Sequence, residues 1–146
     1  MILKSLLLIT LVTSSIDYRE LVHKYNKNTG VPSALLLRII EVESGGDPLA
    51  ESPVGARGLF QLMPIAVKEA RTACPKLKKD LDLFDPDTNV KVAMCFLKAI
   101  RPYWKTYEEL LAFYNGGFKS RDAVRAGKKP PYKETRRYLL KFKEFL

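Results

Sequence analysis

The sequence of 146 residues is short of the side chains that most metal and redox sites need. It contains one histidine, His23, and two cysteines, Cys74 and Cys95. Zinc sites take three or four ligands, mainly from histidine and cysteine, so a zinc centre or another histidine-rich metal site is excluded. A glycine-rich phosphate loop is also missing. We therefore expect neither a metal nor a cofactor.

Strand patterns, repeats and membrane spans are missing as well. No segment alternates apolar and polar residues over a convincing length, and no repeat of about 20–50 residues occurs. The apolar run at residues 6–12 is too short for a bilayer, which takes about 20 residues. Apolar residues instead recur at helical spacing. The sequence predicts an all-α fold, with at most a small hairpin or extended segment near residues 52–63.

The positions of glycine and proline divide the chain into seven expected helices. Asp85 is a typical N-cap before Pro86, whereas Gly116 and Gly117 should end a helix and Ser120 should cap the next one. The last helix should carry inward-facing aromatic residues at positions 138, 142 and 145. The expected helices cover residues 18–25, 32–44, 64–72, 86–100, 106–115, 120–127 and 132–145.

The composition, 47% hydrophobic and 28% charged, is that of one globular domain with a net charge of +9. From Lys119 onward, ten Lys and Arg residues oppose three Asp and Glu residues, which leaves a net +7 in this segment. A basic surface suggests a polyanionic partner such as nucleic acid, an anionic membrane or a cell wall. A solubilising helix face is the alternative. Because no nucleic-acid-binding motif is present, we expect no nucleic acid partner.

Residues 1–15 resemble a signal peptide, with Lys4 before an apolar run and Thr13, Ser14 and Ser15 after it. An uncleaved anchor or an ordinary first helix is the alternative. Cleavage would leave residues 16–146 as the mature domain, exported to the periplasm or the cell exterior. In such an oxidising compartment Cys74 and Cys95 can form a disulfide, although two buried free thiols are the alternative.

One carboxylate lies on the unexpected face of the helix at residues 32–44. With Leu36 at about 0° on a helical projection, Ile40 falls near 40° and Glu43 near 340°. Glu43 is therefore inside the apolar stripe, whereas Glu41 falls beside Arg38 on the polar face. A residue that breaks the polar and apolar pattern often marks a functional site.

Two physical effects are expected to raise the pKa of Glu43. Partial burial disfavours the carboxylate anion, and the C-terminal end of a helix repels negative charge. A glutamate of ordinary pKa, about 4.3, is protonated in about one molecule in 500 at pH 7. At a pKa of about 6, as in lysozyme, about one molecule in eleven is protonated. Glu43 is therefore a candidate general acid, unless it turns back to solvent or accepts hydrogen bonds from the following Gly45 and Gly46.

Three segments, taken in order, resemble the soluble lytic transglycosylase family. The first combines Glu-Ser at 43–44 with Ser-Pro-Val-Gly-Ala-Arg-Gly-Leu-Phe-Gln-Leu-Met-Pro at 52–64. The second is Ala-Phe-Tyr-Asn-Gly-Gly at 112–117, and the third is Glu-Thr-Arg-Arg-Tyr at 134–138. Leu-Phe-Asp-Pro at 83–86 and Asn89 are similar to the start of the family's intervening helix.

The resemblance implies a lysozyme-like, mainly helical fold and a peptidoglycan lytic transglycosylase. Such an enzyme cleaves the β-1,4 bond between N-acetylmuramic acid and N-acetylglucosamine without water and leaves 1,6-anhydromuramic ends. Glu43 would act as acid and then as base. Goose-type lysozymes, which hydrolyse the bond on a similar fold, provide one alternative, and a non-enzymatic basic wall-binding module provides another.

The resemblance also implies seven residues of the glycan-binding cleft. Tyr114 would orient Glu43 or stabilise developing charge, and Asn115 would brace the site. Glu134 and Tyr138 would complete the cleft from the last helix, although a solvated glutamate and ordinary helix packing are the alternatives. The residues expected to bind substrate are Ser52, Gln61, Met63, Tyr114, Asn115, Glu134 and Tyr138.

The chain departs from the family pattern at Gly46, Phe60 and Phe113, which replace an aromatic, a methionine and an alanine that are common there. These changes could reshape the sugar subsites. The expected partner is the peptidoglycan glycan strand, bound by a monomer. A small exported enzyme of this kind suits wall opening for a secretion, conjugation or phage apparatus.

Overall fold

The computed structural model describes residues 17–146. Within this range it has six α-helices, two 3₁₀ turns and no β-strand. The helices are α1 (Tyr18–Tyr25), α2 (Ser33–Ser44), α3 (Pro64–Ala73), α4 (Pro86–Ala99), α5 (Tyr107–Arg125) and α6 (Lys133–Leu140), and the turns are η1 (Arg101–Tyr103) and η2 (Lys143–Phe145). Two isolated bridges, Glu51 to Arg57 and Arg57 to Leu62, lie between α2 and α3. The predicted all-α fold is confirmed.

The predicted signal peptide, residues 1–15, lies outside the described residues. Among residues 17–146, no helix has both the length and the apolar character needed to cross a membrane.

One hydrophobic cluster joins all six helices.

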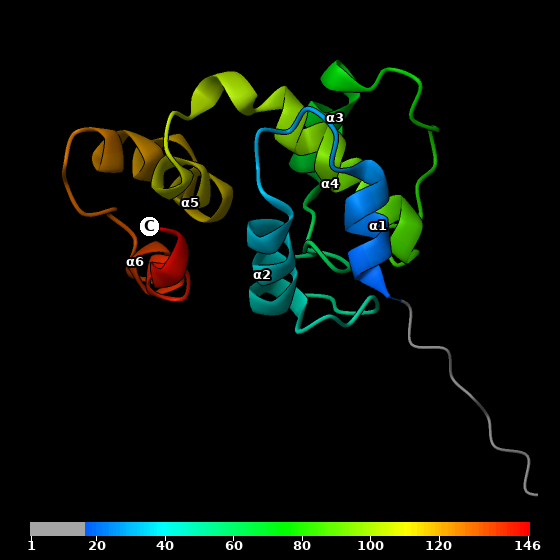
Figure 1. Cartoon of the computed structure of the whole chain (residues 1–146), viewed down its shortest axis with the longest axis horizontal. Helices are drawn as coiled ribbons and strands as arrows, with labels where there is room; N and C mark the ends of the chain where they lie inside the picture. The colour runs from blue at the N-terminus through cyan, green and yellow to red at the C-terminus, as the bar shows by residue number, and fades with distance from the viewer. Residues whose placement is uncertain (1–16) are drawn as a thin grey trace, which may run out of the picture.

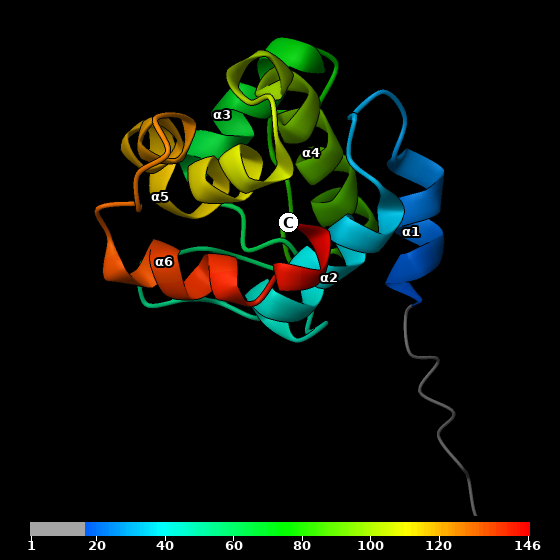
Figure 2. The same cartoon turned by 60° about the vertical axis from the view of Figure 1, so that its left-hand side comes forward.

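Helix α2 lies between two groups of helices. In Figure 1, α5 and α6 lie on one side of α2, and α1, α3 and α4 lie on the other. Figure 2 shows α6 and the C-terminal end of the chain beside α2. Arg38 of α2 fixes this contact, since its Nε donates a hydrogen bond to the carbonyl oxygen of Lys141 at 3.1 Å.

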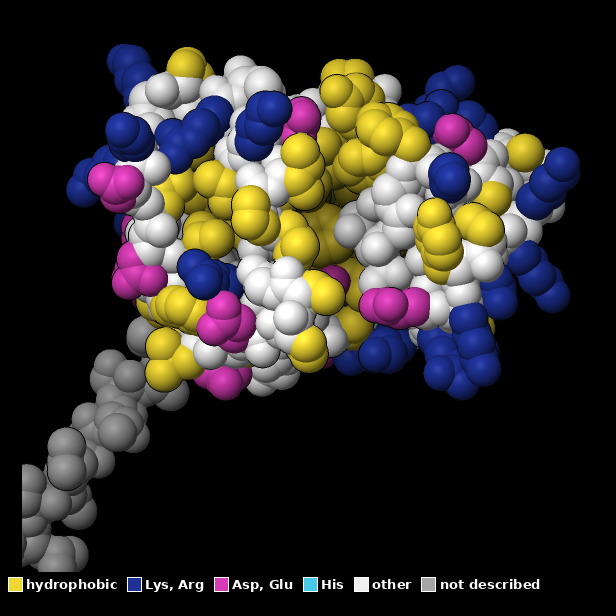
Figure 3. All heavy atoms as spheres, turned by 180° about the vertical axis from the view of Figure 1, so that it is seen from behind, with side chains coloured by type: hydrophobic (Ala, Val, Ile, Leu, Met, Phe, Trp, Pro, Cys, Tyr) yellow, Lys and Arg dark blue, Asp and Glu magenta, His cyan; other side chains and the backbone are white. Residues whose placement is uncertain are grey.

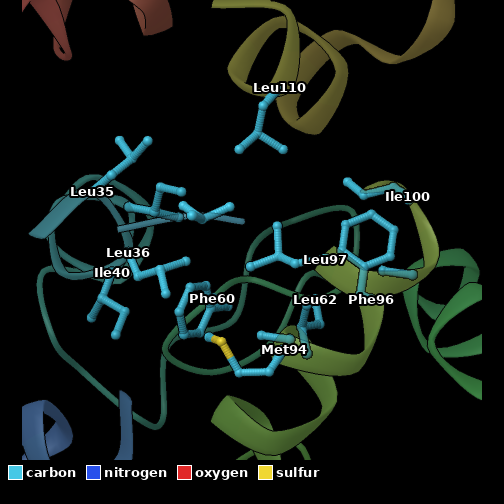
Figure 4. Packing of buried hydrophobic residues seen from close by; sticks show 14 of the residues in the cluster. Leu35, Leu36, Ile40, Phe60, Leu62, Met94, Phe96, Leu97, Ile100 and Leu110 are labelled. Carbon is cyan, nitrogen blue, oxygen red and sulfur yellow. The ribbon is translucent and has the colours of Figure 1, made fainter. Parts of the chain in front are cut away.

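The core is built around the apolar face of α2, as its helical spacing predicts. Leu36 and Ile40 are fully buried and pack with Phe60, Met94 and Leu97 (Figure 4). Phe60 belongs to the segment between α2 and α3, so this segment is part of the core and not a solvated linker. Its backbone path is therefore fixed by packing.

Helix α3 packs against α4, and a disulfide connects this pair. Cys74, directly after α3, is bonded to Cys95 of α4. The start of α4 also follows the sequence prediction, because the Asp85 side chain accepts a hydrogen bond from the backbone N–H of Thr88 at 2.9 Å. Pro86 occupies the first turn, where no backbone N–H is needed.

The break within α5 differs from the prediction. Gly117 alone leaves the helical conformation, with φ 69° and ψ −165°, and the helix resumes at the next residue. Such a positive φ costs glycine little because it has no Cβ atom. The predicted N-cap at Ser120 is wrong, since Ser120 lies inside the second part of α5 and is buried.

The last helix is also shorter than predicted. Helix α6 ends at Leu140, so Phe142 and Phe145 lie beyond it, although Phe142 is fully buried. The carbonyl of Lys141 bonds to Arg38 instead of continuing the helix. A spacing of three to four residues was therefore correct for the buried face but did not show where the helix ends.

Candidate active site

Glu43 lies in the last turn of α2, and its side chain is partly buried. Glu41 is exposed, and its Oε2 lies 3.1 Å from Nη1 of Arg38. The predicted difference between the two glutamates is therefore confirmed. Helix α2 then ends at Gly45, whose φ of 63° is in the left-handed region.

The environment of Glu43 raises the pKa of its side chain toward neutrality. Burial raises the pKa of Glu43 from 4.5 to about 7, against the opposing effects of a hydrogen bond from Tyr138 and the positive charge of Lys141. The negative charge of Glu134 raises this pKa further. At a pKa of about 7, half of the Glu43 side chains carry a proton at pH 7, so both the acid and the base form are available.

The hydroxyl that holds Glu43 belongs to Tyr138. Its oxygen donates to Glu43 Oε1 at 2.7 Å. The resemblance suggested that Tyr114 orients Glu43 or stabilises developing charge, but the Tyr114 hydroxyl donates to the carbonyl oxygen of Phe60 at 2.6 Å and not to Glu43. Tyr114 is nevertheless close enough to Glu43 to sense its charge. Burial, and then the negative charge of Glu43, raise the pKa of Tyr114 well above the ordinary value. The orienting hydrogen bond thus comes from α6 and not from α5.

Three helices hold the backbone of the segment that follows α2. Ser44 of α2 donates a hydrogen bond from Oγ to the carbonyl of Leu59 at 2.8 Å. Tyr114 of α5 binds the next carbonyl, that of Phe60. Asn89 of α4 accepts a hydrogen bond from the N–H of Phe60 at 3.0 Å. Residues 59 and 60 are therefore held at a fixed distance from the end of α2.

Asn89 also holds the chain on both sides of this point. Its Nδ2 donates to the carbonyls of Arg57 at 2.9 Å and Leu83 at 2.8 Å. Gly58 allows this close approach, because a Cβ atom there would lie 2.2 Å from the carbonyl oxygen of Leu83 and 2.3 Å from Asn89 Nδ2. Asn89 is fully buried, so its three hydrogen bonds form in a low-dielectric setting where each lost bond is costly.

Four of the predicted site residues line one cavity of about 520 Å³. Glu43 contributes to it from α2, Asn115 from α5, and Glu134 and Tyr138 from α6. Oδ1 of Asn115 is buried and has no hydrogen-bond partner among the described residues, so it can accept a hydrogen bond from a ligand. The complete lining is Val42, Glu43, Asn115, Lys133, Glu134, Arg137, Tyr138 and Lys141.

Three other predicted residues, Gln61, Met63 and Tyr114, line a second cavity of about 420 Å³. Its aromatic wall includes Phe113 and Phe118, whose ring centroids are 4.9 Å apart. Figure 3 shows the hollowed face of the molecule, with hydrophobic side chains gathered along its upper part and Lys and Arg side chains at its lower right. Such flat apolar surfaces beside polar groups suit the faces and N-acetyl groups of sugars.

The polar groups of the segment between α2 and α3 are partly used within it. Gln61 has a φ of 47°, and its Nε2 donates to the carbonyls of Ala50 and Gly58, each at 3.0 Å. Its Oε1 remains an acceptor. Ser52 Oγ accepts from the N–H of Ala56 at 3.0 Å and keeps its own hydrogen for donation. Ser52 lines neither of the two cavities.

The basic residues of this site were not among those predicted from the sequence. Lys133, Arg137 and Lys141 line the same cavity as Glu43. These three residues are spaced by four, and the first two directly precede Glu134 and Tyr138. The spacing would have placed the three basic residues on one side of the last helix. The aromatic residues Tyr103 and Phe118 were also missed, because they come from separate elements and share no sequence motif.

The described residues contain no cluster of side chains that could bind a metal ion. Among residues 17–146, no group of three His, Cys, Asp or Glu side chains is close enough to hold a metal ion. The cavity of Glu43 is lined by carboxyl, hydroxyl, amide and basic groups.

Residues 20–136 match the family model described as the transglycosylase SLT domain. The soluble lytic murein transglycosylase of Escherichia coli K12 is 29% identical over 85 residues, which are 57% of this chain and 13% of that protein. The Salmonella typhimurium protein of the same name is 27% identical over the same shares of the two chains. The chain thus spans about one eighth of the length of these relatives.

Two solved structures are similar over most of the chain. The 70-kDa soluble lytic transglycosylase of Escherichia coli superposes with a TM-score of 0.73 at 26% identity, covering 85% of this chain and 22% of that one. Lytic transglycosylase Slt of Pseudomonas aeruginosa, in an inactive form with glutamate replaced by glutamine, gives a TM-score of 0.70 at 26% identity, covering 84% and 22%. Because the family model spans most of the sequence, the chain belongs to the transglycosylase SLT domain family.

Proposed function

We propose that this chain is a peptidoglycan lytic transglycosylase, which cleaves the β-1,4 bond between N-acetylmuramic acid and N-acetylglucosamine and leaves 1,6-anhydromuramic ends. The observation that carries this proposal is the state of Glu43: a partly buried carboxyl with a pKa of about 7, held by Tyr138 in a cavity of about 520 Å³. The inactive glutamate-to-glutamine form of the Pseudomonas relative supports a glutamate in this role.

In the first step Glu43 acts as general acid. The hydrogen bond from Tyr138 occupies Oε1, which leaves Oε2 to carry the proton toward the glycosidic oxygen. Proton transfer to that oxygen lets the bond to C1 of the muramic acid break, and the N-acetylglucosamine leaves as an alcohol. The positive charge that develops on the muramic acid ring then lies beside the new Glu43 carboxylate and is stabilised by it.

In the second step the same carboxylate acts as base. It accepts the proton of the muramic acid's 6-hydroxyl while that oxygen bonds to C1, which closes the 1,6-anhydro ring and restores the Glu43 carboxyl. No water is consumed, so a second carboxylate is not required, in contrast to ordinary glycosidases. The loop carboxylates Asp47 and Glu51 are not among the residues that line the cavity of Glu43.

The remaining predicted residues bind the glycan in this proposal. The second cavity, with Gln61, Met63, Tyr114 and the aromatic wall, holds further sugars of the strand. Asn115 offers its unpaired Oδ1 to an N-acetyl N–H or a hydroxyl. The enzyme is exported and meets its substrate, as a monomer, in the periplasm or at the cell exterior. Wall opening for a secretion, conjugation or phage apparatus is its proposed setting.

One observation favours a hydrolase as the second candidate. Glu134 lines the same cavity as Glu43 and is exposed, so it has access to a water molecule. A goose-type lysozyme-like reaction would use this water in place of the 6-hydroxyl.

Mass spectrometry of digested peptidoglycan tests the proposal. The expected products carry 1,6-anhydromuramic ends, which are 18 Da, about the mass of one water, lighter than reducing ends. Reducing ends would show that the enzyme is a hydrolase and not a lytic transglycosylase. In that case Glu134→Gln should abolish the formation of reducing ends. Binding to peptidoglycan without any cleavage, by wild type and Glu43→Gln alike, would instead favour a non-enzymatic wall-binding module.

A further inference from the structure

Helix α6 and its C-cap carry a row of three basic residues beside Glu43, two in the helix and Lys141 directly after it. Lys133, Arg137 and Lys141 are four residues apart, which places them on one side of the helix, and all three line the cavity of Glu43. All three are exposed. The structure therefore presents three positive charges at the entrance to the cavity that contains the proposed acid.

These three side chains are not neutralised by the protein. Within residues 17–146, none of them forms an ion pair, whereas Lys24, Arg38, Arg57, Arg121 and Arg125 each do so. Two carboxyls line the cavity, those of Glu43 and Glu134. When Glu43 is protonated, as its role as acid requires, three positive charges face one negative charge. The cavity then favours an anionic ligand group.

The chemistry of peptidoglycan provides such a group at one of its two sugars. N-acetylglucosamine is neutral, whereas the lactyl ether of N-acetylmuramic acid ends in a carboxyl that is free or linked to a peptide stem with carboxylates of its own. Lys and Arg bind carboxylates through charge-assisted hydrogen bonds. A row of basic residues beside Glu43 thus distinguishes the muramic acid from its neighbour by charge.

We propose that Lys133, Arg137 and Lys141 form a binding site for the carboxylates of the muramic acid's lactyl group and peptide stem. The site sets the register of the glycan strand, because it favours the muramic acid as the sugar held beside Glu43. This inference rests on the proposed function and adds the group that the α6 side of the cavity recognises.

Kinetics on soluble, uncross-linked glycan strands test this site. The test variant combines Lys133→Gln, Arg137→Gln and Lys141→Gln, and the control combines Lys128→Gln, Lys129→Gln and Lys143→Gln, which removes the same charge from outside the cavity. The assay runs at about pH 5.5, below the pKa of Glu43, because Lys141 also lowers that pKa. Three substrates are compared: strands with stems, strands freed of stems by an amidase, and strands whose carboxylates are converted to amides.

On strands with stems, KM of the test variant should rise on the order of tenfold, as three exposed ion pairs allow, with kcat within about twofold. The control should match wild type. On amidated strands, wild type and the test variant should have equal KM. A KM effect that persists on stem-free strands identifies the lactyl carboxylate as the ligand, and one that disappears there identifies the stem.

Two results would overturn the inference. An unchanged KM on strands with stems means that the row is a solvated surface, and an equal rise on amidated strands means that the substitutions disturb α6 itself. If wild type cleaves none of the substrates, the proposed function fails. If wild type cleaves them and the test variant does so equally well, the carboxylate site alone fails.

Discussion

The hydroxyl oxygen of Tyr138 lies 2.7 Å from Oε1 of Glu43, a contact between residues 95 positions apart in the sequence. It joins the end of α2 to the middle of α6 across the cavity. Burial raises the pKa of Glu43, and this hydrogen bond is the largest effect that opposes it. Tyr138 is itself buried, and burial followed by the charge of Glu43 raises its pKa well above the ordinary value. It therefore remains a hydrogen-bond donor throughout the range in which Glu43 titrates.

Activity should decrease as the pH rises through the pKa of Glu43. The first step needs the protonated carboxyl, which is the main form of Glu43 below about pH 7. Above that pH the protonated fraction falls tenfold for each pH unit. We expect kcat/KM to be level on the acid side and to decrease with a midpoint near pH 7. Initial rates on soluble glycan strands between pH 5 and 9 measure this. A decrease on the acid side only would mean that Glu43 acts from the ionised state, and a midpoint near pH 4.5 would also mean that its pKa is not raised.

Replacing Tyr138 by Phe should shift this midpoint upward. The hydrogen bond stabilises the Glu43 carboxylate, and hydrogen bonds to charged groups contribute roughly 1.5–3 kcal/mol, or about 1–2 pKa units. The same pH series on Tyr138→Phe measures the shift. Tyr132→Phe is the control, since Tyr132 is an exposed tyrosine just before α6 and lines neither cavity. A midpoint that stays at pH 7 in Tyr138→Phe would show that the bond does not set the pKa.

The position of Glu43 could be predicted from the sequence because helical periodicity acts over a few residues. The 100° spacing places Glu43 with Leu36 and Ile40, and packing of α2 into the core turns that face inward. The sequence left open whether Cys74 and Cys95 form a disulfide or remain free thiols, since two cysteines carry no spacing signature. The sequence thus predicted the buried face of α2 and the start of α4, but not the continuation of α5 past Gly117 or the end of α6 at Leu140.

The partners of Glu43 could not be predicted in the same way. Tyr114, which is partly buried, and Tyr138, which is buried, both lie in matching motifs, and only the path of the chain decides which hydroxyl reaches the carboxyl. That path depends on Gly117, where one residue of non-helical conformation redirects the second half of α5 toward α6. A change in the backbone conformation of Gly117 alters the direction of the chain after it and so its later contacts. Helical periodicity does not predict such a change.

Glu43→Gln should abolish cleavage and stabilise the fold at neutral pH. A carboxyl whose pKa is raised in the folded state contributes stability below its unfolded value of 4.5 and loses it as the pH rises through about 7. Glutamine does not titrate, so the variant should gain roughly 3 kcal/mol relative to wild type between pH 4.5 and 8. Urea unfolding at these two pH values measures the gain.

Glu41→Gln is the matched control for this stability change. It removes a glutamate two residues away whose exposed ion pair with Arg38 contributes less than about 1 kcal/mol. Its difference from wild type should be small at both pH values. An equal gain in Glu41→Gln would point to the net charge of the protein and not to the buried carboxyl of Glu43.

Asn89→Ala should loosen the segment beside the active site. It removes three hydrogen bonds and leaves Phe60 N and the carbonyl of Leu83 without a partner, whereas the carbonyl of Arg57 keeps its bond from Leu62 N at 3.0 Å. We expect a loss of roughly 3–5 kcal/mol of stability from these unpaired groups. Hydrogen exchange of the Phe60 amide should accelerate far more than exchange in α4. Uniform acceleration throughout the chain would indicate global destabilisation without a local effect.

Reduction of the disulfide between Cys74 and Cys95 should lower stability by about 3 kcal/mol, because the bond closes a loop with a sequence separation of 21 residues. For a chain of this size the midpoint of thermal unfolding should fall by roughly 10 °C. The double variant Cys74→Ala and Cys95→Ala is the control, and a reductant should leave its midpoint unchanged. Since neither cysteine lines the two cavities, reduced protein at 25 °C should keep its kcat/KM. A loss of activity well below the unfolding temperature would mean that the contact between α3 and α4 positions the aromatic wall of the cleft and does more than stabilise the fold.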